Sequence, residues 1–159
     1  MTIPVEQWTP AMLADAEAIR ALKARYFRYV DTKQWAALAD LFTEDATIHF
    51  VQRTDEPEAL AVAIARISGT LQPGATSVHH GTMPEITILS EDEAAAIWSM
   101  TDILVFPEDR PNPLGLRRLE GHGHYHDRYV RRDGLWRIAS LRLERLLVEQ
   151  DLRPGGAGE

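Results

Sequence analysis

The chain has 159 residues, of which 45% are hydrophobic and 26% are charged, and it contains no cysteine. With 17 Lys and Arg against 24 Asp and Glu, its formal net charge at pH 7 is −7, and a negative chain repels a nucleic-acid backbone. The lack of cysteine excludes disulfides, thiolate zinc sites and cysteine nucleophiles. The first residues have the pattern of neither a signal peptide nor a membrane span, so we expect a soluble cytoplasmic protein.

The length predicts a single compact domain over residues 1–152, since a chain of this size buries one sizeable core and is too short for two. The remaining residues, 153–159, read RPGGAGE, and we expect them to form a disordered tail. No internal repeat precedes them.

The first third of the chain has the periodicity of helices. Apolar residues recur at spacings of three and four over 12–30, as in an amphipathic helix with one buried side. A shorter helix is predicted over about 34–42, where Asp31 and Gln34 have the D-x-x-Q form of a capping box, so that Asp31 would accept bonds from free amides. A third helix is predicted over 57–69, between a proline start and a glycine stop.

The rest of the chain has the composition of strands. Segments rich in β-branched and aromatic residues lie at 46–51, 84–90, 94–106, 119–132 and 135–148. The tight connections at 90–93 and 132–134 predict hairpins, and the three prolines of 107–115 predict a longer exposed loop. The sequence therefore predicts an α+β domain whose helices pack on one face of a curved, mainly antiparallel sheet.

Strand alternation puts two charged residues among apolar neighbours. Asp102 shares a strand face with Trp98 and Met100. Arg142 shares a face of another strand with Trp136 and Ile138. A buried carboxylate without a partner is costly, so Asp102 and Arg142 are candidates for an ion pair inside a pocket. Alternatively, each side chain lies near a strand end or reaches water, and alternation alone leaves the two interpretations even.

His122, His124 and His126 alternate along one predicted strand, so their imidazoles share a face. The spacing is compatible with a metal site, but no carboxylate or cysteine cluster elsewhere completes one. A row of histidines facing solvent or another subunit is therefore favoured. The motifs of serine hydrolases, P-loop and dinucleotide-binding proteins and zinc proteases are missing from the sequence.

Three stretches resemble the SnoaL-like branch of the nuclear transport factor 2-like superfamily. They are AIRALKARYFRYVDTKQWAALADLFTEDATIHF (18–50), HHGTMPEI and GHYHDRYVRRDGLWRI (123–138). The resemblance implies a cone-shaped α+β fold in which three N-terminal helices and a curved antiparallel or mixed sheet enclose one deep pocket. Its members include polyketide cyclases, dehydratases, a dehydrochlorinase, steroid isomerases and dioxygenase small subunits, so the fold alone does not select an activity.

The resemblance also implies roles for individual positions. In dehydratase and dehydrochlorinase members, the histidine of H-x-G-T, here His79, acts with an aspartate at the end of the first long helix, here Asp31. Tyr26 falls where the bile-acid dehydratase type carries a helix tyrosine. Asp102 and Arg142 match the remaining polar pocket positions of that enzyme.

Phe50 departs from this pattern, because the bile-acid dehydratase type has a pocket tyrosine at that position. A hydroxyl donor is therefore missing, which argues against the same substrate. His49 has the wrong strand parity to replace it. Steroid isomerases match less well, since their aspartate base would fall at Phe50.

The two histidines of SVHHGTMPEI (77–86) point to opposite faces of an extended chain. Unbroken alternation with the following strand puts His80 on the inner face, whereas Gly81 and Pro84 are able to break the phase with a bulge or bend. The resemblance favours His79 as the pocket residue. A paired core histidine remains the alternative for His79.

These positions suggest a cofactor-independent lyase, specifically a dehydratase, or an isomerase that abstracts a proton from a hydrophobic steroid-like, aromatic or polyketide-like molecule. In this hypothesis His79 is the base, Asp31 orients it, and Tyr26 donates a hydrogen bond to the leaving group or the developing enolate. The expected substrate-binding residues are Asp102, Arg142, Phe50, Trp98, Met100, Trp136 and Ile138. No metal or organic cofactor is needed.

Two hypotheses from other classes stay open: a non-catalytic small-molecule-binding protein, and a small structural subunit of a ring-hydroxylating dioxygenase. Retention of Tyr26, Asp31 and His79 argues against both. We further expect a homodimer or homotrimer that associates through the outer face of the sheet.

Overall fold

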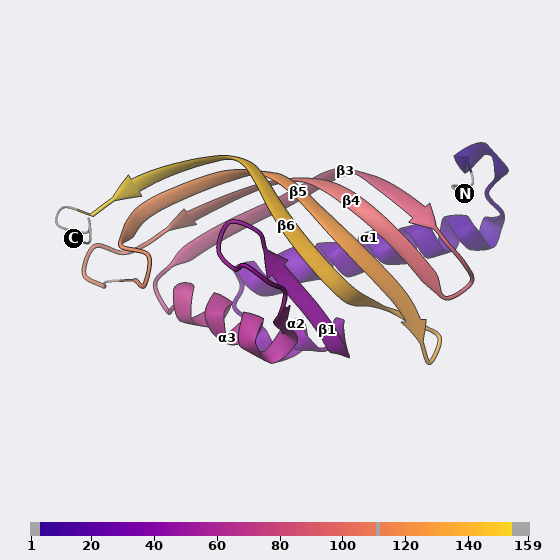
Figure 1. Cartoon of the computed structure of the whole chain (residues 1–159), viewed down its shortest axis with the longest axis horizontal. Coiled ribbons are helices and arrows are strands. Elements are labelled where there is room, and N and C mark those ends of the chain that lie inside the picture. Colours follow the sequence, from indigo (N-terminus) through magenta and orange to yellow (C-terminus); the bar gives the residue numbers. More distant parts are fainter. Residues whose placement is uncertain (1–3, 111, 154–159) are drawn as a thin grey trace.

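The structure, a computed structural model, describes residues 4–110 and 112–153. Within them, a long curved sheet arches over the helices (Figure 1). The helices are α1 (Pro10–Asp31), α2 (Trp35–Ala39) and α3 (Leu60–Thr70), preceded by a 3₁₀ turn at Val5–Gln7. The strands are β1 (Phe42–Phe50), β2 (Glu58–Ala59), β3 (Thr76–Ile88), β4 (Glu93–Val105), β5 (Leu116–Arg132) and β6 (Leu135–Leu152). The predicted α+β class is confirmed.

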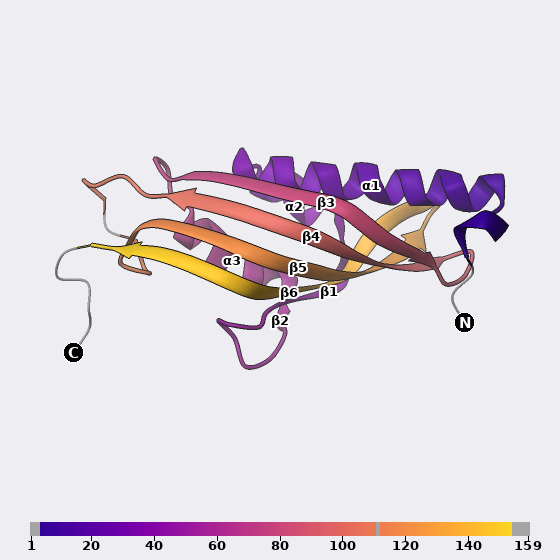
Figure 2. The ribbon, with the colours of Figure 1, turned by 90° about the horizontal axis from the view of Figure 1, so that it is seen from above.

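The six strands form one open sheet in the order β2-β1-β6-β5-β4-β3. β1 and β6 run parallel, and the other neighbouring pairs are antiparallel. Figures 1 and 2 show β3 to β6 as long bent strands, with α1 along one half of the arch and α3 beneath the other. The bend creates a concave inner face that the helices cover, and the candidate site lies on this face.

α1 forms where the apolar spacing predicts it. The Thr9 side chain accepts a hydrogen bond from the backbone amide of Met12 at 3.3 Å, and Pro10 takes the first helical position. The buried side of α1 carries Ala16, Ile19, Leu22, Lys23, Tyr26, Phe27 and Val30. Because this side packs against β3, the helix ends with Asp31 beside that strand.

Two helix starts differ from the prediction. The proposed capping box is wrong: Gln34 makes no side-chain cap for α2, and the Asp31 carboxylate accepts hydrogen bonds from β3 instead. α3 begins at Leu60 and not at Pro57, because the short strand β2 pairs with β1 first. Backbone pairing at the sheet edge thus decides where α3 begins.

All five predicted strands are present, and β1 and β3 begin well before the predicted residues 46 and 84. Both predicted hairpins are confirmed. Asp133 and Gly134 have φ values of 52° and 76°, which suits a two-residue turn between antiparallel strands. The predicted loop over 107–115 connects β4 to β5.

A buried ion pair joins α1 to the sheet. Lys23 Nζ lies 2.7 Å from Asp127 Oδ2, and both side chains have no exposed surface. The Tyr129 hydroxyl donates to the same carboxylate at 2.7 Å and accepts a hydrogen bond from Trp98 Nε1 at 3.1 Å. Burial lowers the pKa of Lys23, and the charge of Asp127 opposes that shift. The ammonium group also lies 3.8 Å from the ring centroid of Tyr125.

Of the predicted disordered tail, residues 154–159 lie outside the described residues. Arg153 is held in place, since its backbone amide donates to the Gly115 carbonyl at 3.0 Å and its guanidinium donates to the Glu108 carbonyl at 2.8 Å. In the described ranges, no helix combines the length and apolar character required to cross a membrane.

Candidate active site

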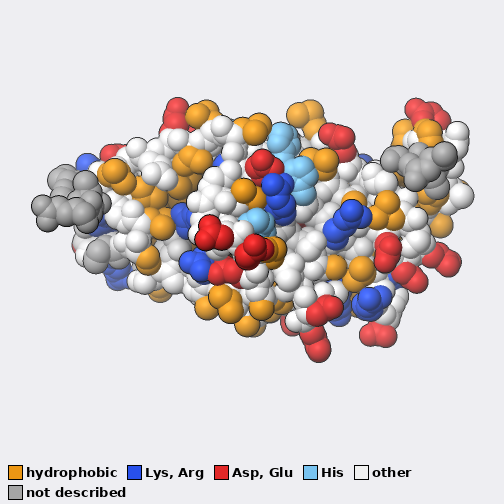
Figure 3. Space-filling view, in the orientation of Figure 1, with side chains coloured by type: hydrophobic (Ala, Val, Ile, Leu, Met, Phe, Trp, Pro, Cys, Tyr) orange, Lys and Arg blue, Asp and Glu red, His pale blue; other side chains and the backbone are white. Residues whose placement is uncertain are grey.

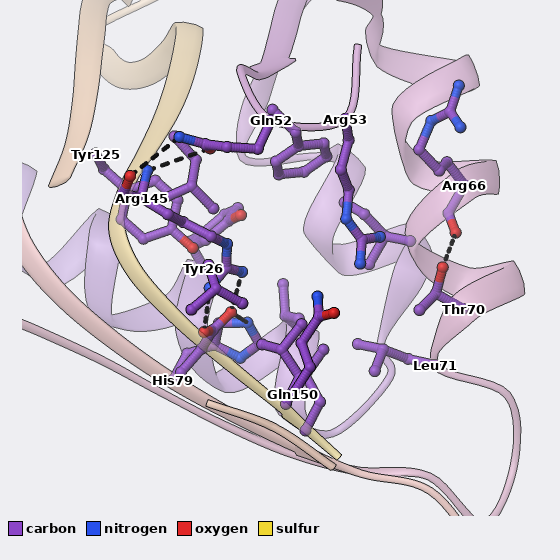
Figure 4. Close-up of a pocket in the computed structure, with 18 residues that line it drawn as sticks. Tyr26, Gln52, Arg53, Arg66, Thr70, Leu71, His79, Tyr125, Arg145 and Gln150 are labelled. Atoms are coloured by element: carbon purple, nitrogen blue, oxygen red, sulfur yellow. Dashed lines mark hydrogen bonds and ion pairs between the residues drawn. The ribbon is translucent and has the colours of Figure 1, made fainter. Parts of the chain in front are cut away.

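A cavity of about 140 Å³ lies between the inner face of the sheet and the helices (Figure 4). Its polar lining residues are Tyr26, Gln52, Arg53, Arg66, Thr70, His79, Asp102, Tyr125, Arg145 and Gln150. Its apolar lining residues are Val30, Phe50, Ile67, Leu71, Leu104, Leu119, Leu143 and Val148. α1, α3 and five strands or their flanking loops therefore contribute to one site.

His79 is fixed by the carboxylate at the end of α1. Its Nδ1 lies 2.6 Å from Asp31 Oδ1, its backbone amide donates to Asp31 Oδ2 at 2.9 Å, and the Ser77 hydroxyl donates to Oδ1 at 3.0 Å. The imidazole also stacks on Phe27, with ring centroids 6.4 Å apart. This network assigns the ring proton to Nδ1, which leaves Nε2 as an acceptor.

His79 faces the cavity because an irregularity in β3 reverses which residues of this strand point inward. The pairing of β3 with β4 shifts between Thr82 and Glu85, and Met83 has a φ of 43° in that interval. His79 lines the cavity, whereas His80 is exposed. Unbroken alternation from the later part of the strand would have selected the wrong histidine.

Asp102 lies next to His79 and pairs with Arg145. The carboxylate has a side-chain exposure of 2%, and Oδ2 lies 3.7 Å from His79 Nε2. Arg145 Nη1 and Nη2 donate to Asp102 Oδ1 and Oδ2, both at 2.5 Å. This bidentate pair supplies the counterion that a buried carboxylate requires.

The predicted pairing of Asp102 with Arg142 is wrong. Arg142 Nη1 donates to Glu144 Oε2 at 2.7 Å, and both side chains are about 40% exposed on the outer face. The register of β5 with β6 passes from Tyr129↔Ile138 to Arg128↔Ser140, so one residue of β6 is unpaired. This bulge reverses the strand parity, and Arg145 takes the inner position.

Two glycines of β5 make room for Arg145. A Cβ on Gly121 would lie 1.6 Å from Arg145 Nη1 and 2.5 Å from Asp102 Oδ1. A Cβ on Gly123 would lie 2.1 Å from the Glu144 carbonyl oxygen. The alternating glycines of GHGHYH are therefore the sequence signal that could have revealed this close approach.

Tyr26 and Tyr125 place phenol groups in the same cavity. Tyr26 is 3% exposed, and its ring meets that of Tyr125 edge to face, with centroids 6.0 Å apart. Burial raises the pKa of both phenols well above 10, and the charge of Asp127 adds to the shift at Tyr26. Both hydroxyls therefore remain protonated at neutral pH and act as hydrogen-bond donors. Tyr125 is absent from the predicted site.

The predicted apolar walls need correction. Phe50 lines the cavity as expected, but four other predicted residues pack in the core outside its lining: Trp98, Met100, Trp136 and Ile138. The indole of Trp136, for example, donates to Asp15 Oδ1 at 3.0 Å. The apolar residues that take their place lie in α1, α3, β4, β5 and β6 or directly after α3, and only the folded chain brings these elements together.

The histidine row lies on the opposite face of the sheet from the cavity. His122 Nδ1 lies 3.1 Å from Thr101 Oγ1, and the rings of His124 and His126 meet edge to face with centroids 6.4 Å apart. Figure 3 shows histidines near the middle of the visible face, beside both basic and acidic side chains. In the described part of the chain, no group of three His, Asp or Glu side chains is arranged to hold a metal ion.

Residues 11–142 match the family model of the SnoaL-like domain. Among solved structures, a provisionally named scytalone dehydratase from Novosphingobium aromaticivorans has a TM-score of 0.77 and 22% identity, over 96% of this chain and 100% of that one. A type 2 hexachlorocyclohexane dehydrochlorinase (LinA) has a TM-score of 0.73 and 21% identity, over 92% and 97% of the two chains. The Kfla4162 protein from Kribbella flavida has a TM-score of 0.72 and 25% identity, over 87% and 95%.

Proposed function

The chain belongs to the SnoaL-like family, and from this premise we propose that it is a cofactor-independent lyase or isomerase. Its reaction would begin with removal of a proton from a small hydrophobic substrate held beside His79. Two of the similar structures are named for the elimination of water or of hydrogen chloride. Their names indicate a reaction class for those proteins, and in this chain the hydrogen bond between His79 and Asp31 supports the same class.

The observation that carries the proposal is the bond between His79 and Asp31. With Nδ1 donating to the carboxylate at 2.6 Å, the lone pair of Nε2 is directed to the side of the ring that faces the cavity and Asp102. An imidazole has an unperturbed pKa of about 6.5, which suits a general base near neutral pH. The stacking of His79 on Phe27 keeps this orientation.

The same geometry stabilises the product of proton transfer. When Nε2 takes the proton, the imidazolium lies between Asp31 and Asp102, at 2.6 Å and 3.7 Å from their nearest oxygens. Arg145 pairs with Asp102 and so compensates the buried charge of this carboxylate. The positive charge on His79 is therefore created where two carboxylates already lie, and little rearrangement is needed.

Tyr26 is placed to assist the other half of the reaction. The electrons of the broken C–H bond form a C=C bond or an enolate, and the leaving group departs with the electrons of its own bond. A neutral phenol in a buried site donates a hydrogen bond to the oxygen that gains charge, either the leaving hydroxyl or the enolate oxygen. The raised pKa of Tyr26 keeps that proton in place.

The cavity volume favours a substrate whose reacting part is one ring. A cavity of about 150 Å³ in another protein is known to hold benzene, and this cavity is about 140 Å³. A polycyclic or steroid-like substrate would have to extend beyond it. We therefore place aromatic and single-ring ketone or alcohol substrates first among the proposed classes.

The test compares the two adjacent histidines. A panel of hydroxylated and ketonic ring compounds is screened for loss of water, migration of a double bond, or exchange of a C–H proton in deuterated water. For a substrate found in this way, His79→Ala should lower kcat by at least about 10³-fold, because the base is lost. Thermal melts of the purified variants check their folding.

His80→Ala is the matched control, since it removes an exposed imidazole from the neighbouring position of β3. It should keep most of the activity. Equal losses in both variants, or activity that survives His79→Ala, would overturn the assignment of the base. A non-catalytic binding protein or a structural dioxygenase subunit would show no turnover that depends on His79.

A further inference from the structure

Arg53 is a charged group in the cavity for which the chain supplies no counterion. It follows β1, lines the cavity, and points into it from the side opposite His79 (Figure 4). Across residues 4–110 and 112–153, the Arg53 side chain forms no ion pair and no hydrogen bond. The chain has more acidic than basic residues, so a shortage of carboxylates does not explain why Arg53 has no counterion.

The other two cavity arginines are already engaged. Arg145 makes its bidentate contact with Asp102. Arg66 Nε donates to Glu58 Oε2 at 2.9 Å, and its Nη2 donates to Glu58 Oε1. Arg53 is therefore the cation that remains for a ligand among the described residues that line the cavity.

Arg53 is partly open to solvent, and a second cationic side chain, Arg145, lies near it. Partial burial and the nearby charge of Arg145 lower the pKa of Arg53, and Asp102 offsets this only in part from a distance. A bound anion would relieve both effects, since it supplies negative charge and accepts hydrogen bonds from the guanidinium.

Arg53 also lines a second pocket, which adjoins the cavity. The inner cavity shares Arg53, Arg66 and Thr70 with this second pocket of about 450 Å³, which Gly69 and Leu114 help to line. A Cβ on Gly69 would meet no atom within 4 Å, so this side is open. A ligand group held by Arg53 therefore lies at the opening of the cavity, while the remainder of the ligand faces His79.

We propose that the substrate carries an anionic oxygen group, a carboxylate or a phosphate, that Arg53 binds at the opening of the cavity. The inference rests on the proposed function in one respect, namely that the reacting carbon lies beside His79. A guanidinium presents paired donors that match the oxygens of either group. The anion thus sets which end of the substrate enters first, and with it which carbon reaches the base.

The test measures binding, so it requires no turnover. Benzoate, phenyl phosphate and the neutral isostere benzamide are titrated into the full chain at fixed ionic strength, with affinity taken from calorimetry or from NMR shifts. At least one of the two anions should bind at least tenfold more tightly than benzamide. Arg53→Gln should abolish that preference, and Arg53→Lys should retain part of it, because the charge stays and the paired donors are lost.

Arg128→Gln is the matched control, because it removes the same charge from an exposed residue outside the cavity lining. It should leave the preference intact. A preference for phenyl phosphate alone, or for benzoate alone, supports the inference and identifies the group. Equal affinity for all three probes, no saturable binding of either anion, or a preference that survives Arg53→Gln would overturn it.

The two proposals fail in distinguishable ways. If Arg53→Gln leaves anion binding unchanged while His79→Ala abolishes turnover, the lyase proposal stands and the anion site is wrong. If anion binding depends on Arg53 and no turnover depends on His79, the cavity is a binding site without the proposed chemistry.

Discussion

His79 lies between two carboxylates whose surroundings differ. Asp31 is held by Ser77 and by the backbone and ring of His79 itself, all from β3. Asp102 is almost fully buried and is held by Arg145. Asp31 therefore orients the imidazole and selects its tautomer, while Asp102 contributes charge near Nε2.

The hydroxyl of Tyr26 gives a prediction that separates chemistry from packing. Tyr26→Phe keeps the ring, which packs against Phe27, Phe42 and Tyr125, and removes one donor. We expect kcat to fall by about 10²- to 10³-fold with KM nearly unchanged, as for the loss of one donor to a developing oxyanion.

The fall in kcat caused by Tyr26→Phe should also be the same at every pH between about 6 and 9. The pKa of Tyr26 is raised above its usual value of 10, so the hydroxyl is protonated throughout this range and no alkaline limb arises from it. Steady-state kinetics of both proteins across that range provide the measurement. A loss that disappears as the pH rises would mean that Tyr26 ionises during the reaction.

Bulges decide which side chains the strands present to the cavity. The irregularity between Thr82 and Glu85 turns His79 inward, and the unpaired residue of β6 after Ile138 turns Arg145 inward and Arg142 outward. Each bulge shifts the parity of the rest of its strand relative to its neighbour. The site therefore depends on two local departures from regular pairing.

Gly121 provides a test of the row formed by β3, β4 and β5, in which His79, Asp102 and Gly121 are direct cross-strand neighbours. Gly121→Ala would put a Cβ 1.6 Å from Arg145 Nη1 and displace the guanidinium. Asp102 would then lose its partner while buried. We expect a loss of about 3–5 kcal/mol in the free energy of unfolding, measured by chemical denaturation.

Gly69→Ala is the control for this substitution, because a Cβ at that position of α3 meets no atom within 4 Å. Its effect should be about 1 kcal/mol or less, and of stabilising sign, since alanine favours a helix. If Gly121→Ala is as stable as Gly69→Ala, then the Arg145 side chain has another place to lie and the ion pair is not required.

The arch of the sheet over α1 is held by apolar packing and by polar contacts, and among these contacts the Lys23–Asp127 ion pair is fully buried. Lys23 and Asp127 have no exposed side-chain surface, and they connect the centre of α1 to β5. Ion pairs of this kind contribute little net stability as a pair, yet the removal of one member is costly. The pair therefore specifies how α1 sits on the sheet, and so where Tyr26 and Asp31 lie.

Lys23→Met should lower the free energy of unfolding by about 3–5 kcal/mol, because Asp127 is left buried without its counterion. Lys23→Met combined with Asp127→Asn should be more stable than the single variant, since the amide still accepts the hydrogen bond from Tyr129. Urea unfolding curves of the three proteins provide the comparison. A double variant no more stable than the single one would show that the unpaired carboxylate of Asp127 is not the source of the loss.

Association through the outer face of the sheet stays a prediction. That face carries the histidine row and the Arg142–Glu144 pair, and exposed apolar residues lie near the end of β6 at Leu146, Leu147 and Leu152. Light scattering at several protein concentrations would give the oligomeric state.

Local pattern by itself determined most elements of this protein. The spacing of apolar residues in α1, the β-branched segments and the turn at Asp133 and Gly134 are short-range properties, and they reappear in the structure. The resemblance to the SnoaL-like family also implies that Tyr26, Asp31 and His79 belong to one site, and the structure places these side chains in or beside one cavity.

Only the tertiary structure decided the partners of these residues. Alternation predicted Arg142 as the partner of Asp102, because a bulge in β6 leaves no clear signal in the sequence of that strand. Asp31 resembled a helix cap because its partners on β3 are more than 40 residues away in the chain. Arg53, Arg145 and Tyr125 reach the cavity from three separate segments. Periodicity reports which face of its own element a residue occupies, whereas the register between strands and the packing of helices determine what that face meets.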